Sequence, residues 1–143
     1  MKESLRPGIT RTEHITIDRD RTISFMGEAA RVYATPRLVS DIEYCCRNLI
    51  LDHADAGEDS VGTEIALKHL APSLPGATVT ITVTVSVVDR RRIAFAVTAR
   101  DELEEISTGT HTRFIVDVAK TIERLQTKAT KHAAASGQGG RAP

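Results

Sequence analysis

The stretch TPRLVSDIEYCC (residues 35–46) predicts the helix that decides the fold. Its apolar side chains recur at helical spacing and form one apolar stripe. Thr35 offers a hydroxyl for the N-cap and Pro36 suits the first helical position, so we expect the helix to begin here and to end near residues 53–54. Glu43 projects at the edge of the stripe, where an ionised carboxylate needs either water or a buried partner.

The region after this helix is dominated by strand patterns. Three stretches alternate apolar and polar residues, as strands of a half-buried antiparallel sheet do, and short turns between them predict a meander. With a further strand before Pro72 and one bent or two short strands near the N-terminus, the expected strands cover residues 14–25, 61–71, 77–88, 92–101 and 104–118.

This order of elements predicts an α+β fold. A helix with one apolar side precedes a sheet with one apolar face, so we expect the antiparallel β-sheet to wrap around a long central helix, which is the hot-dog arrangement. Such a sheet leaves edge strands, and pairing of edges in a homodimer is the expected way to cover them. We expect one domain over residues 1–133, with a short polar helix at 119–135, and a disordered tail at 134–143.

Composition excludes several classes of function. The formal net charge of the 143 residues is zero, which gives no field that would attract nucleic acid or an anionic membrane. No apolar run approaches the roughly 20 residues that span a bilayer, and the first residues lack a signal-peptide pattern. Cys45 and Cys46 fit a reducing, cytoplasmic environment. Metal-binding Cys/His spacing and Gly-rich phosphate loops are absent, so neither a metal nor a cofactor is predicted.

Four short motifs follow one another along the chain. They are Thr35 with Glu43 eight residues later, Gly62 with His69 seven residues later, the turn PSLPG at 72–76, and the strand STGTHTRF at 107–114. The ordered series resembles the single-domain hot-dog thioesterases of the fluoroacetyl-CoA thioesterase type over residues 30–118. The resemblance implies hydrolysis of an acyl thioester, carried on coenzyme A or on an acyl carrier protein, in specialised or acyl metabolism.

The resemblance also implies roles for individual residues. Thr35, Glu43 and His69 fall on the residues that surround the thioester in that family. Glu43 would be the nucleophile or general base, His69 would orient and charge it, and Thr35 would position substrate or water. Gly62 matches a glycine whose backbone lies near the thioester, and His111 matches a histidine that we take as structural. The active sites of the family lie at a dimer interface.

The chain departs from the family pattern around Thr35. Arg37 lies two residues after it, and residues 26–34 lack the phenylalanines that close the pocket of the best-known member, so fluoroacetyl specificity is not carried over. If Arg37 points into the site, its guanidinium can bind a carboxylate on the acyl chain or on an incoming amino acid. The second case is the alternative reaction: addition of an amine such as glycine to an α,β-unsaturated acyl thioester, then hydrolysis to a β-amino acid.

Other readings of the same residues remain open. Thr35 can be only an N-cap and Glu43 only a surface residue, in a non-catalytic module that binds an acyl thioester or in a dimeric scaffold protein. Geometry also separates the two residues, because Glu43 lies about 12 Å farther along the helix axis at 1.5 Å per residue. They can meet one substrate only if it is extended or if one of them acts across the dimer interface.

Overall fold

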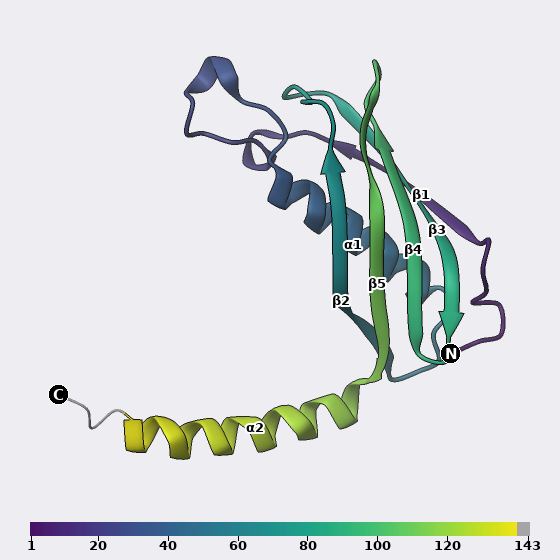
Figure 1. Cartoon of the computed structure of the whole chain (residues 1–143), viewed down its shortest axis with the longest axis vertical. Coiled ribbons are helices and arrows are strands. Elements are labelled where there is room, and N and C mark those ends of the chain that lie inside the picture. Colours follow the sequence, from purple (N-terminus) through teal and green to yellow (C-terminus); the bar gives the residue numbers. More distant parts are fainter. Residues whose placement is uncertain (140–143) are drawn as a thin grey trace.

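A five-stranded antiparallel sheet and a helix packed on one of its faces form the body of the protein. The computed structural model describes residues 1–139 and places the strands in the order β1-β3-β4-β5-β2 (Figure 1). The elements are β1 (Thr10–Thr16), α1 (Thr35–Leu51), β2 (Glu58–His69), β3 (Thr78–Asp89), β4 (Arg92–Arg100), β5 (Glu105–Asp117) and α2 (Val118–Gly139), with 3-10 turns at Arg19–Arg21 and Glu28–Ala30.

The core lies between α1 and the inner face of the sheet. The predicted apolar stripe of α1 is buried, including both cysteines, and the inward valines and isoleucines of β3 alternate with half-buried threonines as predicted. The β3-β4-β5 meander is confirmed by its antiparallel pairing. The buried residues of α1 are Leu38, Asp41, Ile42, Cys45, Cys46, Leu49 and Ile50.

Two local predictions about the N-terminal half were wrong. Ala34, not Thr35, is the N-cap of α1, and no side chain caps the helix. The Thr35 hydroxyl instead bonds to the histidine at the end of β2. The N-terminal strand is Thr10–Thr16, where it pairs with β3, and most of the segment predicted as strand at 14–25 is loop.

The C-terminal helix is longer than predicted. α2 continues to Gly139, so residues 134–139, expected to be disordered, are helical, while residues 140–143 of the predicted tail lie outside the described residues. α2 leaves the end of β5 and extends past the β2 edge of the sheet, away from the body (Figure 1). None of the helices in the described part of the chain is long and apolar enough to cross a membrane.

The two edge strands of the sheet differ in character. β1 presents threonines and charged side chains, whereas β2 exposes Val61 and Ile65 along 12 residues that contain no proline. A long edge strand with exposed apolar side chains is a template for pairing with another strand. The β2 edge is therefore the better candidate for a contact between two copies of the chain.

Candidate active site

A threonine and a histidine meet where α1 begins and β2 ends. The Thr35 Oγ1 lies 2.8 Å from the Nδ1 of His69. The other ring nitrogen of His69, Nε2, is buried and has no hydrogen-bond partner among residues 1–139. Burial lowers the pKa of His69 below its usual range, so the ring is neutral near pH 7 and can accept a proton from the hydroxyl.

An apolar pocket opens beside this pair. It has a volume of about 340 Å³, and Thr35 and His69 place a hydroxyl and an imidazole in its wall. The pocket suits an apolar group whose polar end reaches the Thr35 hydroxyl. Its other lining residues, which together with Thr35 and His69 define what we call the apolar pocket, are Ile23, Phe25, Val32, Tyr33, Leu70, Ala71 and Pro72.

Tyr33 fixes the back of the His69 ring. The two rings meet edge to face with centroids 6.2 Å apart, and Tyr33 is buried. Its hydroxyl donates to the Asp41 carboxylate, which also accepts from the Arg21 Nε at 3.0 Å. Burial and the neighbouring Asp41 carboxylate raise the pKa of Tyr33, so its hydroxyl remains a donor. This buried network holds the imidazole in one orientation.

Glu43 lies in a second, polar pocket, two turns farther along α1. That pocket has a volume of about 570 Å³. A Cβ added to Gly62 would come 3.1 Å from the Glu43 Oε1 and 3.1 Å from the His111 Cε1, so a side chain at this position would press against both groups. The polar pocket is lined by Ser40, Glu43, Tyr44, Arg47, Ser60, Val61, Gly62 and Arg113.

A buried arginine, Arg113, lines the polar pocket and bonds to the buried His111. His111 Nδ1 donates to the carbonyl oxygen of Glu64 at 2.7 Å, so its Nε2 accepts from the Arg113 Nη1 at 3.3 Å. Arg113 also donates to the Oγ and carbonyl oxygen of Ser60, at 2.7 and 2.8 Å. Burial lowers the pKa of Arg113, and the charge of Glu43 is the largest influence that opposes this shift. His111 is thus structural in the sense predicted, and Arg113 is a buried cation that faces Glu43.

The structure groups the predicted residues in two places within one chain. Thr35 lies with His69, and Glu43 lies with Gly62, so the predicted contact between Glu43 and His69 is not made inside a single chain. Arg37 donates to the carbonyl oxygen of Asp20 at 3.1 Å and lines neither pocket.

Four further residues of the site were missed at the level of sequence. Phe25 lies one residue before the segment 26–34 that lacks phenylalanines, and Tyr33 and Asp41 belong to no motif. Arg113 had a usable signal, because it shares the inward face of β5 with His111, where a charged residue is out of place. Within residues 1–139 no group of three His, Cys, Asp or Glu side chains could hold a metal ion.

Comparison with known proteins identifies similar chains. Residues 17–119 match the family described as fluoroacetyl-CoA-specific thioesterase. The fluoroacetyl-CoA thioesterase of Streptantibioticus cattleyicolor is 30% identical over 135 residues, covering 90% of this chain and 97% of that one. A crystal structure of a mutant of the fluoroacetyl-CoA-specific thioesterase superposes with a TM-score of 0.82 at 30% identity, covering 89% of this chain and 99% of that one.

A more distant structure has the same fold. A hot-dog-like protein from Thermanaerovibrio acidaminovorans superposes with a TM-score of 0.79 at 23% identity, covering 85% of this chain and 91% of that one. The hot-dog fold predicted from the sequence is confirmed.

Proposed function

The chain belongs to the fluoroacetyl-CoA-specific thioesterase family and is an acyl-CoA thioester hydrolase, and we propose that its active site is shared between two copies of the chain. One observation carries the proposal: among residues 1–139 the buried Nε2 of His69 lacks a partner, while Glu43 lies beside the same edge strand at Gly62. In a dimer with a two-fold axis through that edge, Glu43 of each chain lies beside His69 of the other chain.

The strand positions support this arrangement. The register of β2 shifts between Gly62 and Glu64, where Thr63 is an extra residue, so Gly62 and His69 lie on the same face of the strand. If two β2 strands pair antiparallel about an axis at Ala66, Gly62 lies opposite the partner's His69. Residues that lie directly opposite in such a pair share one face of the sheet. The face is the right one, because His69 bonds to Thr35 on α1, and the Cβ direction of Gly62 points at Glu43 on α1. Neighbouring strands lie about 4.8 Å apart, so the partner's Glu43 comes within reach of the His69 Nε2.

The shared site suggests how the thioester is cleaved. His69 Nδ1 takes the proton of the Thr35 hydroxyl while Oγ1 bonds to the acyl carbon, and the partner's Glu43 accepts a hydrogen bond from Nε2–H and stabilises the imidazolium. The C–S bond then breaks, and the coenzyme A thiolate takes the proton from His69. Water cleaves the acyl-threonine by the same proton transfers in reverse order. The positive end of the α1 dipole lies near the developing oxyanion.

This mechanism reassigns the predicted roles. Glu43 was expected to attack the thioester or to activate water, with His69 as its support. The group that bonds to the neutral imidazole is instead Thr35, at 2.8 Å. We therefore propose Thr35 as the nucleophile and His69 as the base. The partner's Glu43 orients the His69 ring and stabilises its protonated form. The buried free cysteines fit a cytoplasmic enzyme, and an acyl carrier protein is the second carrier that we propose to test.

Mixing two inactive variants tests the shared site. The variants His69→Ala and Glu43→Ala are each expected to be inactive as homodimers. In a random mixture of the two, half of the dimers are mixed and each contains one intact site, so about a quarter of wild-type activity should return.

The pair Thr35→Ala and His69→Ala is the matched control. Because Thr35 and His69 come from the same chain, no mixed dimer of these variants contains an intact site, and activity should not return. If activity returns in neither mixture, Glu43 and His69 act within one chain and the shared site is overturned.

The alternative reaction has a direct assay. The protein is incubated with saturated and 2-enoyl thioesters of coenzyme A, with and without glycine, and the products are identified by mass spectrometry. We expect the free acid whether or not glycine is present. A glycine adduct formed only from the enoyl thioesters would show amine addition, and no product from any substrate would identify the protein as a binding module.

A further inference from the structure

The C-terminal helix α2 has an amphipathic surface that no other part of residues 1–139 covers. Its apolar residues recur at i, i+4, i+7, i+11 and i+15, which is one face of a helix. Ile122 is 49% exposed and Leu125 is 59% exposed, although both are large apolar side chains. The residues of this apolar face are Val118, Ile122, Leu125, Ala129 and Ala133.

A second stripe on the same helix is basic. Lys120, Arg124, Lys128 and Lys131 follow at i, i+4, i+8 and i+11, roughly a third of a turn or more from the apolar face at 100° per residue. Glu123 is the single acidic residue between Val118 and Gly137. A surface that covers α2 should therefore offer apolar side chains with carboxylates beside them.

The opposite end of the sheet presents such a surface. Three leucines in the β2–β3 connection and the β4–β5 turn are exposed, and Leu103 is 85% exposed. Three exposed carboxylates lie beside them, at Glu102, Glu104 and Glu105, whereas Asp101 is buried and accepts hydrogen bonds from its own turn. We call this surface the leucine end, and its residues are Leu70, Leu74, Glu102, Leu103, Glu104 and Glu105.

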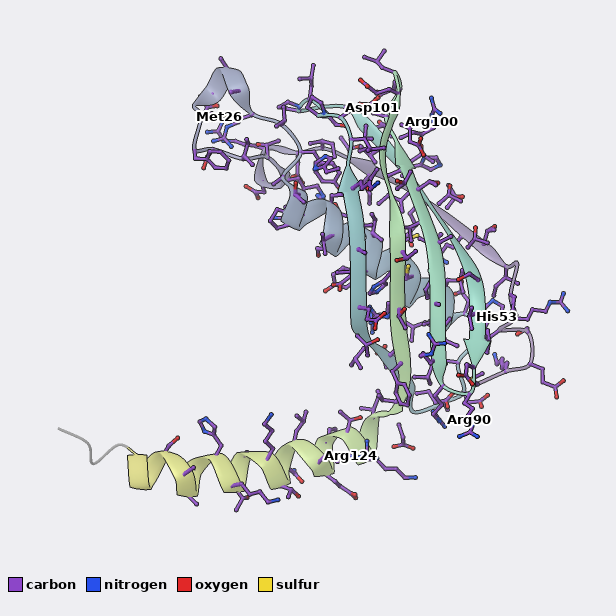
Figure 2. All side chains as sticks on the ribbon, in the orientation of Figure 1. Met26, His53, Arg90, Arg100, Asp101 and Arg124 are labelled. Atoms are coloured by element: carbon purple, nitrogen blue, oxygen red, sulfur yellow. The ribbon has the colours of Figure 1, made fainter. Side chains whose placement is uncertain are left out.

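The two surfaces cannot meet inside one chain. Figure 2 shows Arg124 of α2 at one end of the molecule and Asp101 at the other, with the length of the sheet between them. Yet α2 extends past the β2 edge (Figure 1), on the side where the partner would lie. The two-fold axis proposed above turns the partner by half a turn, so that its leucine end lies at the α2 end of this chain.

We propose that α2 crosses to the second copy of the chain and packs its apolar face on the partner's leucine end. The inference rests on the β2-paired dimer of the proposed function. The 22 residues of α2 make a helix of about 33 Å, and the four strand spacings of the partner's sheet span about 19 Å, so the reach is sufficient. Lys128, which borders the apolar face, is then the basic side chain nearest the carboxylates of the leucine end, whereas Lys120 and Lys131 lie on the far side of α2. Leu70 also lines the apolar pocket, so α2 bounds the mouth of the partner's acyl site.

Cross-linking between two single-cysteine variants tests the contact. Leu125→Cys protein is mixed with Leu103→Cys protein and treated with a short bis-maleimide. We expect a covalent dimer from the mixture and none from either variant alone. Cys45 and Cys46 contribute little, because both are buried and burial raises the pKa of Cys45 to about 12. Thr127→Cys, on the polar face of α2, replaces Leu125→Cys in the control and should cross-link much less.

A charge-matched pair of double variants gives a second measurement. Ile122→Glu with Leu125→Glu should weaken the dimer at least about 100-fold and raise the KM for acyl-CoA, because four buried apolar side chains per dimer become charged. Thr127→Glu with Thr130→Glu adds the same charge to the polar face and should leave both quantities within about twofold. Sedimentation equilibrium measures the first quantity and initial rates the second.

The outcomes separate this inference from the proposed function. A wild-type protein that is a dimer and hydrolyses acyl-CoA, but gives no cross-link and tolerates the two glutamates on the apolar face, would overturn the crossing of α2 and leave the shared site intact. A cross-linked dimer without thioesterase activity would retain the crossing and overturn the function.

Discussion

The two pockets along α1 differ in what each lacks. The apolar pocket holds the Thr35 hydroxyl bonded to the His69 imidazole, but the far nitrogen of this ring has no hydrogen-bond partner among residues 1–139. The polar pocket holds a carboxylate and a buried cation, Arg113, which has no carboxylate within ion-pair distance in the described part of the chain. Arg113 is satisfied by Ser60 and His111, but buried polar groups normally have partners, so the unpaired Nε2 of His69 indicates that a group is missing from the apolar pocket.

This difference shows why the site cannot be judged from one chain. The core is complete without a second copy, because the inner faces of β3, β4 and β5 are already covered by α1. The β2 edge is not complete, and the two groups that need each other lie near its opposite ends. Folding of the chain and assembly of the site are therefore separate steps, and mutations can affect one without the other.

The largest expected effect on kcat comes from replacing Thr35 or His69 in the apolar pocket. His69→Ala should lower kcat by about 10³-fold or more, because it removes the base that activates the nucleophile. Thr35→Ala should have a similar effect, and Thr35→Ser should retain much of the activity, since it keeps the hydroxyl. Steady-state kinetics with a short-chain acyl-CoA measures all three.

The variant Glu43→Gln distinguishes the two roles considered for the Glu43 carboxylate, as the nucleophile or general base and as the group that supports His69. If Glu43 orients the His69 ring and stabilises the imidazolium, the variant should lose about 10²- to 10³-fold in kcat. A covalent acyl-threonine should still form, but slowly. Mass spectrometry of the quenched enzyme detects that intermediate. An acyl group found on Glu43 of the wild-type protein would restore the carboxylate as nucleophile, and unchanged turnover of the variant would remove Glu43 from the mechanism.

A smaller effect is expected where the polar pocket is tightest. Gly62→Ala brings a methyl group to 3.1 Å from the Glu43 carboxylate and from the His111 ring, so both must move by a few tenths of an ångström. We expect kcat/KM to fall about tenfold, with the melting temperature little changed, because a displacement of the carboxylate weakens its contact across the dimer. An equal loss in stability and activity would mean that Gly62 only serves packing.

The sequence was sufficient for the fold because the fold follows from periodicity. Helical spacing in α1 and strict alternation in β3 survive in the structure almost residue for residue. The site was predicted as a set of residues, but not as an arrangement, because hydrogen bonding at Thr35 depends on where β2 ends. No pattern in the sequence indicated that Asp41 is buried, because its partners Tyr33 and Arg21 come from the segment before α1.

The free energy of unfolding should depend on pH through His111, with an effect of intermediate size. Burial lowers the pKa of His111, so the unfolded chain binds a proton more readily than the native one. Above an unfolded pKa of about 6.5 both states are neutral and stability is complete, and stability falls as pH drops below it. Protonation of His111 would also place two positive charges next to each other, because its Nε2 lies 3.3 Å from the Arg113 Nη1. Thermal melts between pH 7 and pH 5 should show a decline that is smaller in His111→Gln.

That variant has its own cost at pH 7. Loss of a buried hydrogen bond should reduce the free energy of unfolding by about 1–3 kcal/mol. His132→Gln on the exposed surface of α2 is the matched control and should change neither the stability nor its pH dependence. If the decline between pH 7 and pH 5 is as steep in His111→Gln as in the wild type, another group is responsible for it.

The smallest effect is expected at Arg37, and it sharpens the contrast between the two arginines near the site. Arg113 is buried against the polar pocket, whereas Arg37 is exposed and bonds to a loop carbonyl. Arg37→Ala should therefore change kcat/KM for an unsubstituted acyl-CoA by no more than about twofold. The informative measurement repeats the assay with an acyl chain that ends in a carboxylate. A selective loss with that substrate would mean that Arg37 turns into the pocket when a carboxylate is bound, as its position two residues after Thr35 first suggested, and an equal response to both substrates would leave it as a loop-anchoring residue.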